Sequence, residues 1–186
     1  MWISSYELLQ IVVMCVSLGY IFMDYIKPPK HNYDPLNMQR FDWDNFWFAM
    51  AVTAPAIVLH EFGHKFVALA FGATATLHAA YMWIAIAIIL KLMKSPVLMF
   101  VAAFVAISGR VTYGQSALIS LAGPGVNFLI FLTASLLLKY QKFSHKVTLG
   151  LIMTKRVNMI LMIFNMLPIP GFDGWGFFHS MYKLIF

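Results

Sequence analysis

Charged residues are scarce in this sequence, and acidic residues are the scarcest. Only 11% of the 186 residues are charged, 61% are hydrophobic, and Asp and Glu together occur seven times. Soluble domains average about a quarter charged and about half apolar residues. The composition therefore excludes an ordinary soluble domain and predicts a multi-pass protein of the cell membrane, with the lipid bilayer as its surroundings.

Cysteine is nearly absent as well. The single thiol, Cys15, excludes an internal disulfide framework. The chain also lacks internal repeats, low-complexity stretches and any polar segment long enough for a separate soluble domain. We therefore predict one membrane-embedded domain over residues 1–186.

Basic residues outnumber acidic ones, which gives a formal net charge of +6. The Lys and Arg residues gather at the ends of apolar runs and in the connector KYQKFSHK at 139–146. This placement is typical of interfacial anchors against anionic lipid. We therefore expect no nucleic-acid partner.

Long apolar runs are what the sequence has in abundance. Three of them reach the roughly 20 residues that a helix needs to cross the hydrocarbon core, at 3–26, 46–71 and 115–138, and a fourth covers 157–169. The first run lacks a basic start, contains Glu7 and ends in DYIKPPK, so it is interpreted as a retained helix over 1–26 and not as a signal peptide. A polar connector follows at 27–45.

The segment 73–112 does not have a helical pattern throughout. ATATLHAAY at 73–81 alternates polar and apolar residues, and FVAISGRVT at 104–112 is β-branched, so both favour strands. The apolar stretch 79–95 is broken by two lysines and is short for a span, which favours a re-entrant or interfacial element. We predict an all-α polytopic membrane fold: about four transmembrane helices around a three-helix catalytic core at about 46–176, with a small strand and re-entrant element between helices two and three.

The run VLHEFGHKFV at 58–67 places His60, Glu61 and His64 inside an apolar helix. Residues four apart lie on one helix face, so both imidazoles can point at one metal ion, while Glu61 flanks it and can accept a proton from metal-bound water. Zinc suits such a site. An HExxH match arises by chance in many proteins, but a carboxylate buried in an apolar helix needs a compensating charge.

NMLPIPGFDGWG at 165–176 supplies a third ligand. Pro168, Pro170, Gly171 and Gly174 oppose a helix here, and unwound backbone at membrane depth is tolerated only when it is buried in protein or lines a wet cavity. Asp173 is therefore predicted to reach the metal. The alternatives are a solvated aspartate at an interfacial helix end and His179 as a substitute ligand.

SLAGPGVNF at 120–128 is less specific. Ala122, Gly123 and Gly125 permit close helix approach. Asn127 then serves either as a helix–helix contact or as a donor to substrate or to a developing oxyanion.

Together, HEFGH at 60–64, AGPGVN at 122–127 and NMLPIPGFDG at 165–174 resemble the site-2 protease family of intramembrane zinc metalloproteases. The resemblance implies one zinc ion per chain held by His60, His64 and Asp173. It also implies Glu61 as catalytic acid/base and Asn127 near the substrate. The implied activity is cleavage of the transmembrane segments of substrate proteins.

Two other classes of function stay open, a zinc carrier and a catalytically silent scaffold. A carrier needs no general base, and the motif positions are intact, so both are disfavoured. One further expectation concerns residues 104–112, which we predict to form an edge strand that pairs with the unwound substrate. The alternative for this segment is an internal hairpin with 73–81.

Overall fold

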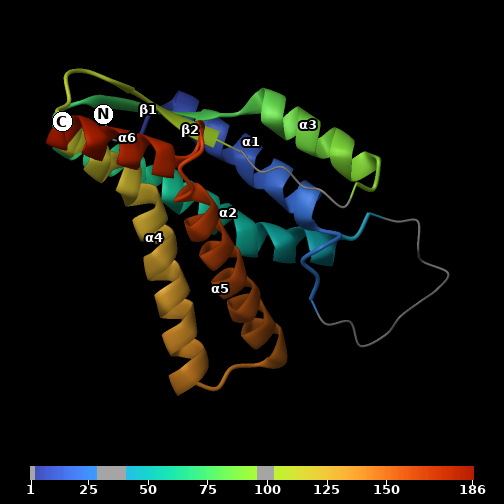
Figure 1. Cartoon of the computed structure of the whole chain (residues 1–186). Coiled ribbons are helices and arrows are strands. Elements are labelled where there is room, and N and C mark those ends of the chain that lie inside the picture. The colour runs from blue at the N-terminus through green and yellow to red at the C-terminus, as the bar shows by residue number, and fades with distance from the viewer. Residues whose placement is uncertain (1–2, 29–40, 96–102) are drawn as a thin grey trace.

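The computed structural model describes residues 3–28, 41–95 and 103–186. Most of the predicted connector at 27–45 therefore lies outside the described residues. The described chain contains α1 (Ser5–Phe22), α2 (Trp43–Ala70), β1 (Thr74–Ala79), α3 (Tyr81–Leu92), β2 (Ala103–Ser108), α4 (Tyr113–Tyr140), α5 (His145–Asn165) and α6 (Asp173–Ile185). The predicted fold class is confirmed: the chain is mostly helical, with one small sheet (Figure 1).

Four helices, α1, α2, α4 and α5, are long and apolar enough to cross a membrane. The first three match the predicted runs, and the four together suggest a membrane protein. Local sequence sets where they begin: Ser4 and Glu7 form a capping box at α1, and Thr112 and Gln115 form another at α4.

The fourth helix begins earlier than the predicted run at 157–169. Lys155 and Arg156 interrupt the apolar pattern there, yet α5 continues through them from His145. The Lys155 ammonium lies 5.6 Å from the centroid of the Phe131 ring on α4, a cation–π contact that accommodates the charge. The helix ends at Asn165, close before Pro168, which cannot continue it.

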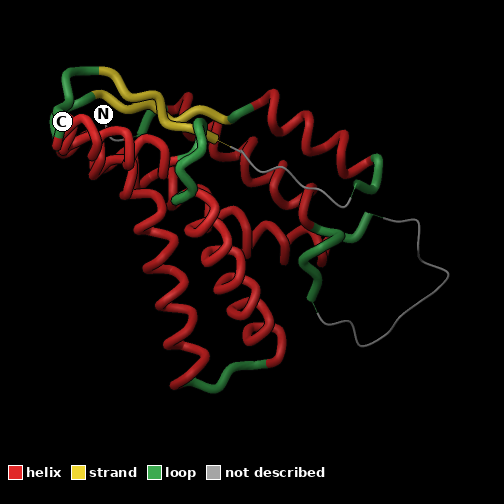
Figure 2. The backbone as a smooth tube through the Cα atoms, in the orientation of Figure 1, coloured by secondary structure: helices red, strands yellow, loops and turns green. Residues whose placement is uncertain are grey.

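The two strands pair antiparallel, with register from Thr74 opposite Ser108 to Ala79 opposite Ala103. Figure 2 shows this sheet lying across the helices. The strand prediction is confirmed for 74–79 and 104–108, whereas Tyr81 already belongs to α3. Residues 109–112 do not continue β2, because Gly109 has a φ of +127° that ends the extended run. Between the strands, α3 has only 12 residues, too short to span the hydrocarbon core, as expected for this segment.

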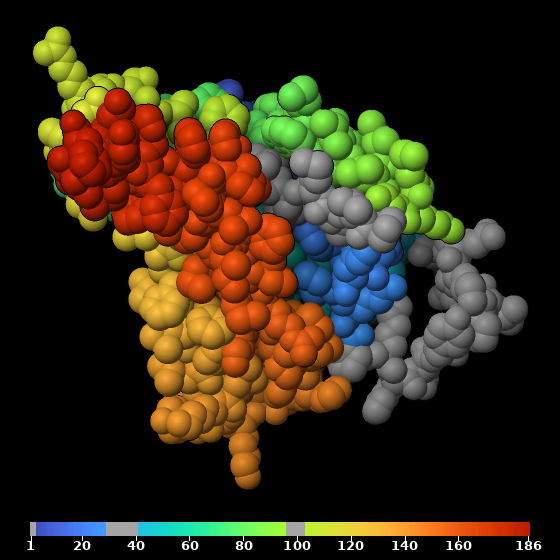
Figure 3. All heavy atoms as spheres, in the orientation of Figure 1, coloured from blue at the N-terminus to red at the C-terminus, as the bar shows by residue number. Residues whose placement is uncertain are grey.

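Helix α2 is the most buried of the four candidate spans and packs against α1, α4 and α5. Gly63 brings α2 close to α4: a Cβ at this position would lie 2.8 Å from the Ala122 carbonyl oxygen. Beside this contact, α4 and α5 form an antiparallel pair (Figure 1). The terminal helix α6 covers the surface at one end of the molecule (Figure 3). One apolar cluster joins α1, α2, β1 and α3 through Leu18, Ile57, Leu77 and Ile84.

Candidate metal centre

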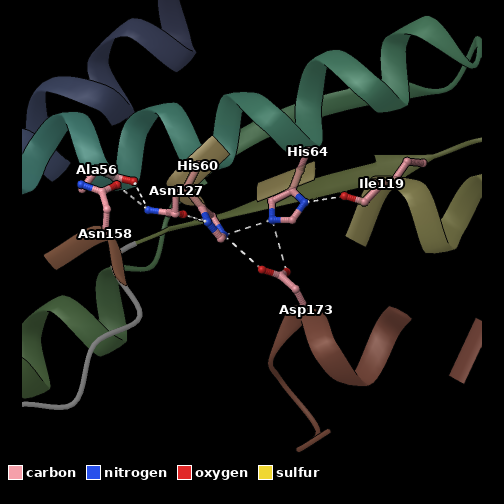
Figure 4. Close-up of polar contacts among 7 residues, drawn as sticks. All are labelled: Ala56, His60, His64, Ile119, Asn127, Asn158 and Asp173. Carbon is pink, nitrogen blue, oxygen red and sulfur yellow. Dashed lines mark hydrogen bonds and ion pairs between the residues drawn. The ribbon is translucent and has the colours of Figure 1, made fainter. Parts of the chain in front are cut away.

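Three predicted ligands meet at one point, as Figure 4 shows. The Nε2 atoms of His60 and His64 are 3.1 Å apart. One carboxylate oxygen of Asp173 lies 3.1 Å from His60 Nε2, and the other lies 3.2 Å from His64 Nε2. Among the described residues, these three form the group of side chains that could hold a metal ion, with ligand atoms within 4.8 Å of one another.

The second nitrogen of each imidazole is engaged elsewhere. His60 Nδ1 lies 2.5 Å from Asn127 Oδ1, and His64 Nδ1 lies 2.7 Å from the Ile119 carbonyl oxygen. Because both partners are acceptors, each Nδ1 carries a proton, and Nε2 is the nitrogen of each ring that faces Asp173 and can bind a metal ion. Two Nε2 atoms and a carboxylate at this separation are stable together when positive charge, from protons or a metal ion, lies between them.

A chain of amides fixes the orientation of His60. Asn127 Nδ2 donates to Asn158 Oδ1 at 2.8 Å and to the Ala56 carbonyl oxygen at 3.1 Å, and Asn158 Nδ2 donates to the Thr154 carbonyl oxygen at 2.8 Å. Both asparagine side chains are fully buried. Such partners of a ligating histidine fix its tautomer and ring orientation. Sequence reasoning missed Asn158, although an amide within the apolar α5 was a usable signal.

Both ends of the Asn127 amide have partners within the protein. Its side-chain oxygen faces His60 and its nitrogen donates to two protein acceptors, so the amide offers no free donor to a substrate or an oxyanion. The physical reason is its position on α4, fully buried where α4 meets α2 and α5. Asn127 therefore contacts a candidate ligand, as a residue at a helix–helix contact, and its expected role near the substrate stays a prediction.

Gly123 leaves room for the ligands. A Cβ at this position would lie 2.7 Å from His60 Nε2, which no real side chain tolerates. The glycine-rich segment is predicted to permit a close approach between helices. At Gly123 the absence of a side chain is required, because a Cβ would clash with the imidazole of His60. Gly125, by contrast, has no neighbour within 4 Å of an added Cβ.

Asp173 is the first residue of α6. The predicted helix break therefore covers 166–172, and Gly174 belongs to the helix that follows. Burial raises the pKa of the Asp173 carboxyl, but its contacts with His60 and His64 lower it more, to about 2. The carboxylate is thus ionised at neutral pH. His179 is exposed, stacks on Trp175 with centroids 6.0 Å apart, and is not part of the metal-binding group.

Glu61 lies beside the three ligands in a cavity of about 240 Å³. Its side chain is buried, as are His60 and His64. Four residues of β2 also line the cavity: Ala103, Phe104, Val105 and Ile107. The cavity therefore joins the candidate ligands, a carboxylate that can accept a proton, and an extended strand.

The donor set fits a zinc ion. Two imidazole nitrogens and one carboxylate oxygen are the ligand types of zinc sites with three protein ligands, which keep one position open. The adjoining cavity leaves space for a further small ligand. The residues present therefore point to a metal, and zinc matches their chemistry.

Comparison with known proteins agrees with this site. Over 172 residues, the chain is 27% identical to a protein of Methanocaldococcus jannaschii named "Putative zinc metalloprotease MJ0611", covering 92% of this chain and 82% of that protein. No protein-family model matches the chain, and no solved structure matches it. The chain is thus similar to a protein named as a zinc metalloprotease, and it holds a His60–His64–Asp173 group that could bind a metal ion.

Proposed function

We propose that this protein is an intramembrane zinc metalloprotease, of the kind found in the site-2 protease family, which hydrolyses peptide bonds within the transmembrane segments of other membrane proteins. The observation that carries the proposal is the convergence of His60, His64 and Asp173 beside Glu61, with both histidines and Glu61 on α2, a helix long and apolar enough to cross a membrane. One zinc ion per chain follows from this single group of ligands in the described residues.

Each residue of the site has a distinct role in hydrolysis. A zinc ion held by the three ligands would act as a Lewis acid and lower the pKa of water in the site towards about 7. Glu61 would accept a proton from that water as it adds to the scissile carbonyl carbon, and would then pass the proton to the leaving amine nitrogen. Asn127 and Asn158 hold the His60 ring in place.

The substrate must be extended before this chemistry can reach it, because the backbone of an intact helix is enclosed by its own hydrogen bonds. Unpaired backbone groups in a dry setting cost several kcal/mol each. A strand edge beside the cavity would satisfy them by β-addition. β2 pairs with β1 along one edge, which is the internal hairpin considered as the alternative. Its second edge is not paired with β1 and can accept a substrate strand.

The pairing pattern identifies which residues face that second edge. The N–H groups of Leu77 and Ala79 donate to side chains on α1, so they point away from β2. In an antiparallel pair, the residues opposite them also direct their backbone groups outward. The outward set on β2 is Ala103, Val105 and Ile107, and all three line the cavity together with Phe104.

Proline substitution of β2 tests this edge. Ile107→Pro removes an outward N–H, so it is expected to weaken substrate crosslinking and raise KM about tenfold, the effect of roughly one lost buried hydrogen bond. Ile107→Ala keeps the N–H and serves as the matched control for the lost side chain. Steady-state cleavage of a labelled transmembrane substrate would measure the change.

Ala106→Pro provides the complementary variant, because Ala106 directs its N–H towards Thr76 on β1. It is expected to disturb the sheet itself. If both proline variants crosslink and cleave normally with zinc still bound, β2 is not the substrate strand.

The proposed activity is tested with purified protein in detergent or vesicles and a labelled transmembrane substrate. We expect cleavage that a zinc chelator abolishes and added zinc restores. A zinc carrier would instead move zinc across a sealed vesicle without cleaving the substrate. A scaffold would do neither, so the assay separates the three functions.

A further inference from the structure

A buried ion pair lies outside the metal centre. Glu7 on α1 and Lys65 on α2 form a salt bridge, with relative exposures of 4% and 1%. Both residues belong to candidate spans, where charged side chains are costly and require partners. Lys65 directly follows the ligand His64 in sequence. The hydrolytic chemistry uses neither member of the pair, so their burial needs its own explanation.

The Glu7 carboxylate connects three elements. Its Oε1 accepts hydrogen bonds from Lys65 Nζ and, at 2.8 Å, from the backbone N–H of Leu77 on β1. Its Oε2 accepts from the Ser4 backbone N–H at 2.9 Å and from the Ser4 hydroxyl at 3.2 Å. One side chain therefore joins the start of α1 to α2 and to the sheet.

Gln10 makes a similar contact three residues later. Its Oε1 accepts a hydrogen bond from the Ala79 backbone N–H at 3.1 Å. Residues three apart share a helix face, and alternate residues of a strand direct their N–H groups to the same edge. Helix α1 therefore supplies acceptors along the outer edge of β1, where a further strand would otherwise pair.

We propose that Glu7, Gln10 and Lys65 are positioning residues that hold the β1–β2 sheet over the metal centre and direct a substrate strand to the free edge of β2. The inference rests on the proposed function. Because α1 occupies the outer edge of β1, strand addition is left to the edge of β2 that lines the cavity. Because Lys65 adjoins His64, the same contacts set the position of the sheet relative to a metal ligand.

Two double variants separate the strand contact from the ion pair. Glu7→Leu with Lys65→Met removes both charges and the acceptor for the Leu77 N–H. Glu7→Gln with Lys65→Met also removes both charges but keeps a side-chain carbonyl at that place. Neither leaves a buried charge without its partner, the change that destabilises most. Leu8→Ala, on the 59% exposed neighbouring position of α1, is the control.

Two readouts are measured on the full chain: hydrogen exchange of the β1 amides and KM for a transmembrane substrate. In the Glu7→Leu double variant we expect faster exchange in β1 and a KM about tenfold higher, as for one lost buried hydrogen bond, with zinc content unchanged. The Glu7→Gln double variant should restore both values towards wild type. Leu8→Ala should leave both unchanged.

The readouts distinguish failure of this inference from failure of the proposed function. Unchanged exchange in the Glu7→Leu double variant would show that α1 does not hold the sheet, and faster exchange with an unchanged KM would overturn the role in substrate placement. A wild-type protein that cleaves nothing would refute the proposed function and the substrate role, and the exchange data would still decide whether α1 holds the sheet. If the Glu7→Leu double variant does not fold, Gln10→Leu removes the Ala79 contact alone and should show the same two changes.

Discussion

Glu61→Gln is expected to lower the rate of substrate cleavage by at least about a hundredfold while zinc stays bound, because general acid–base groups contribute factors of about 10² to 10⁴. The amide has nearly the shape of the carboxylate but cannot accept a proton from water. Glu61 is not among the three ligands, so the substitution leaves the metal-binding group intact. Zinc content and single-turnover cleavage should be measured on the same preparation.

Glu61→Asp is the matched control for this variant. It keeps a carboxylate on the same helix face but shortens its reach, so cleavage should fall between wild type and Glu61→Gln. Turnover by Glu61→Gln that is comparable to wild type would remove the assigned role. Loss of zinc from Glu61→Gln would instead mean that Glu61 supports the metal directly.

Asp173→Ala is expected to abolish cleavage and to weaken zinc binding by more than the roughly 10- to 100-fold that loss of an outer-shell partner costs. The carboxylate supplies the oxygen ligand and the only negative charge among the three ligands. Without it, two neutral imidazoles are left to hold a divalent ion. Competition against a chelator of known affinity would give the change in zinc binding.

His179→Ala tests the alternative third ligand. His179 lies on the same helix, α6, but is exposed and stacked on Trp175, so its removal should leave zinc affinity and cleavage at wild-type levels. The opposite pattern, with zinc lost from His179→Ala and kept by Asp173→Ala, would mean that the third ligand is misassigned.

The sequence alone determined the composition class, the three long apolar runs, the strand segments and the candidate ligands. These features are local: hydropathy over about 20 residues, alternation over a few residues and the four-residue spacing of His60 and His64 follow directly from helix and strand geometry. The third ligand could also be found, since Asp173 is one of only two acids after Asp44 and follows a segment that opposes a helix. Local pattern failed at α5, where a contact with Phe131 on another helix accommodates Lys155.

Tertiary structure alone decided what surrounds the ligands. Asn158 forms a hydrogen bond with Asn127, which lies 31 residues away in the sequence. Lys65 forms one with Glu7, which lies 58 residues away. The sequence neighbours of each partner give no sign of which distant group it contacts. Burying such groups requires hydrogen-bonding or charged partners, but which partners are available depends on how the helices pack. The same packing turned Asn127 towards His60 and placed α1 along β1, which leaves β2 facing the cavity.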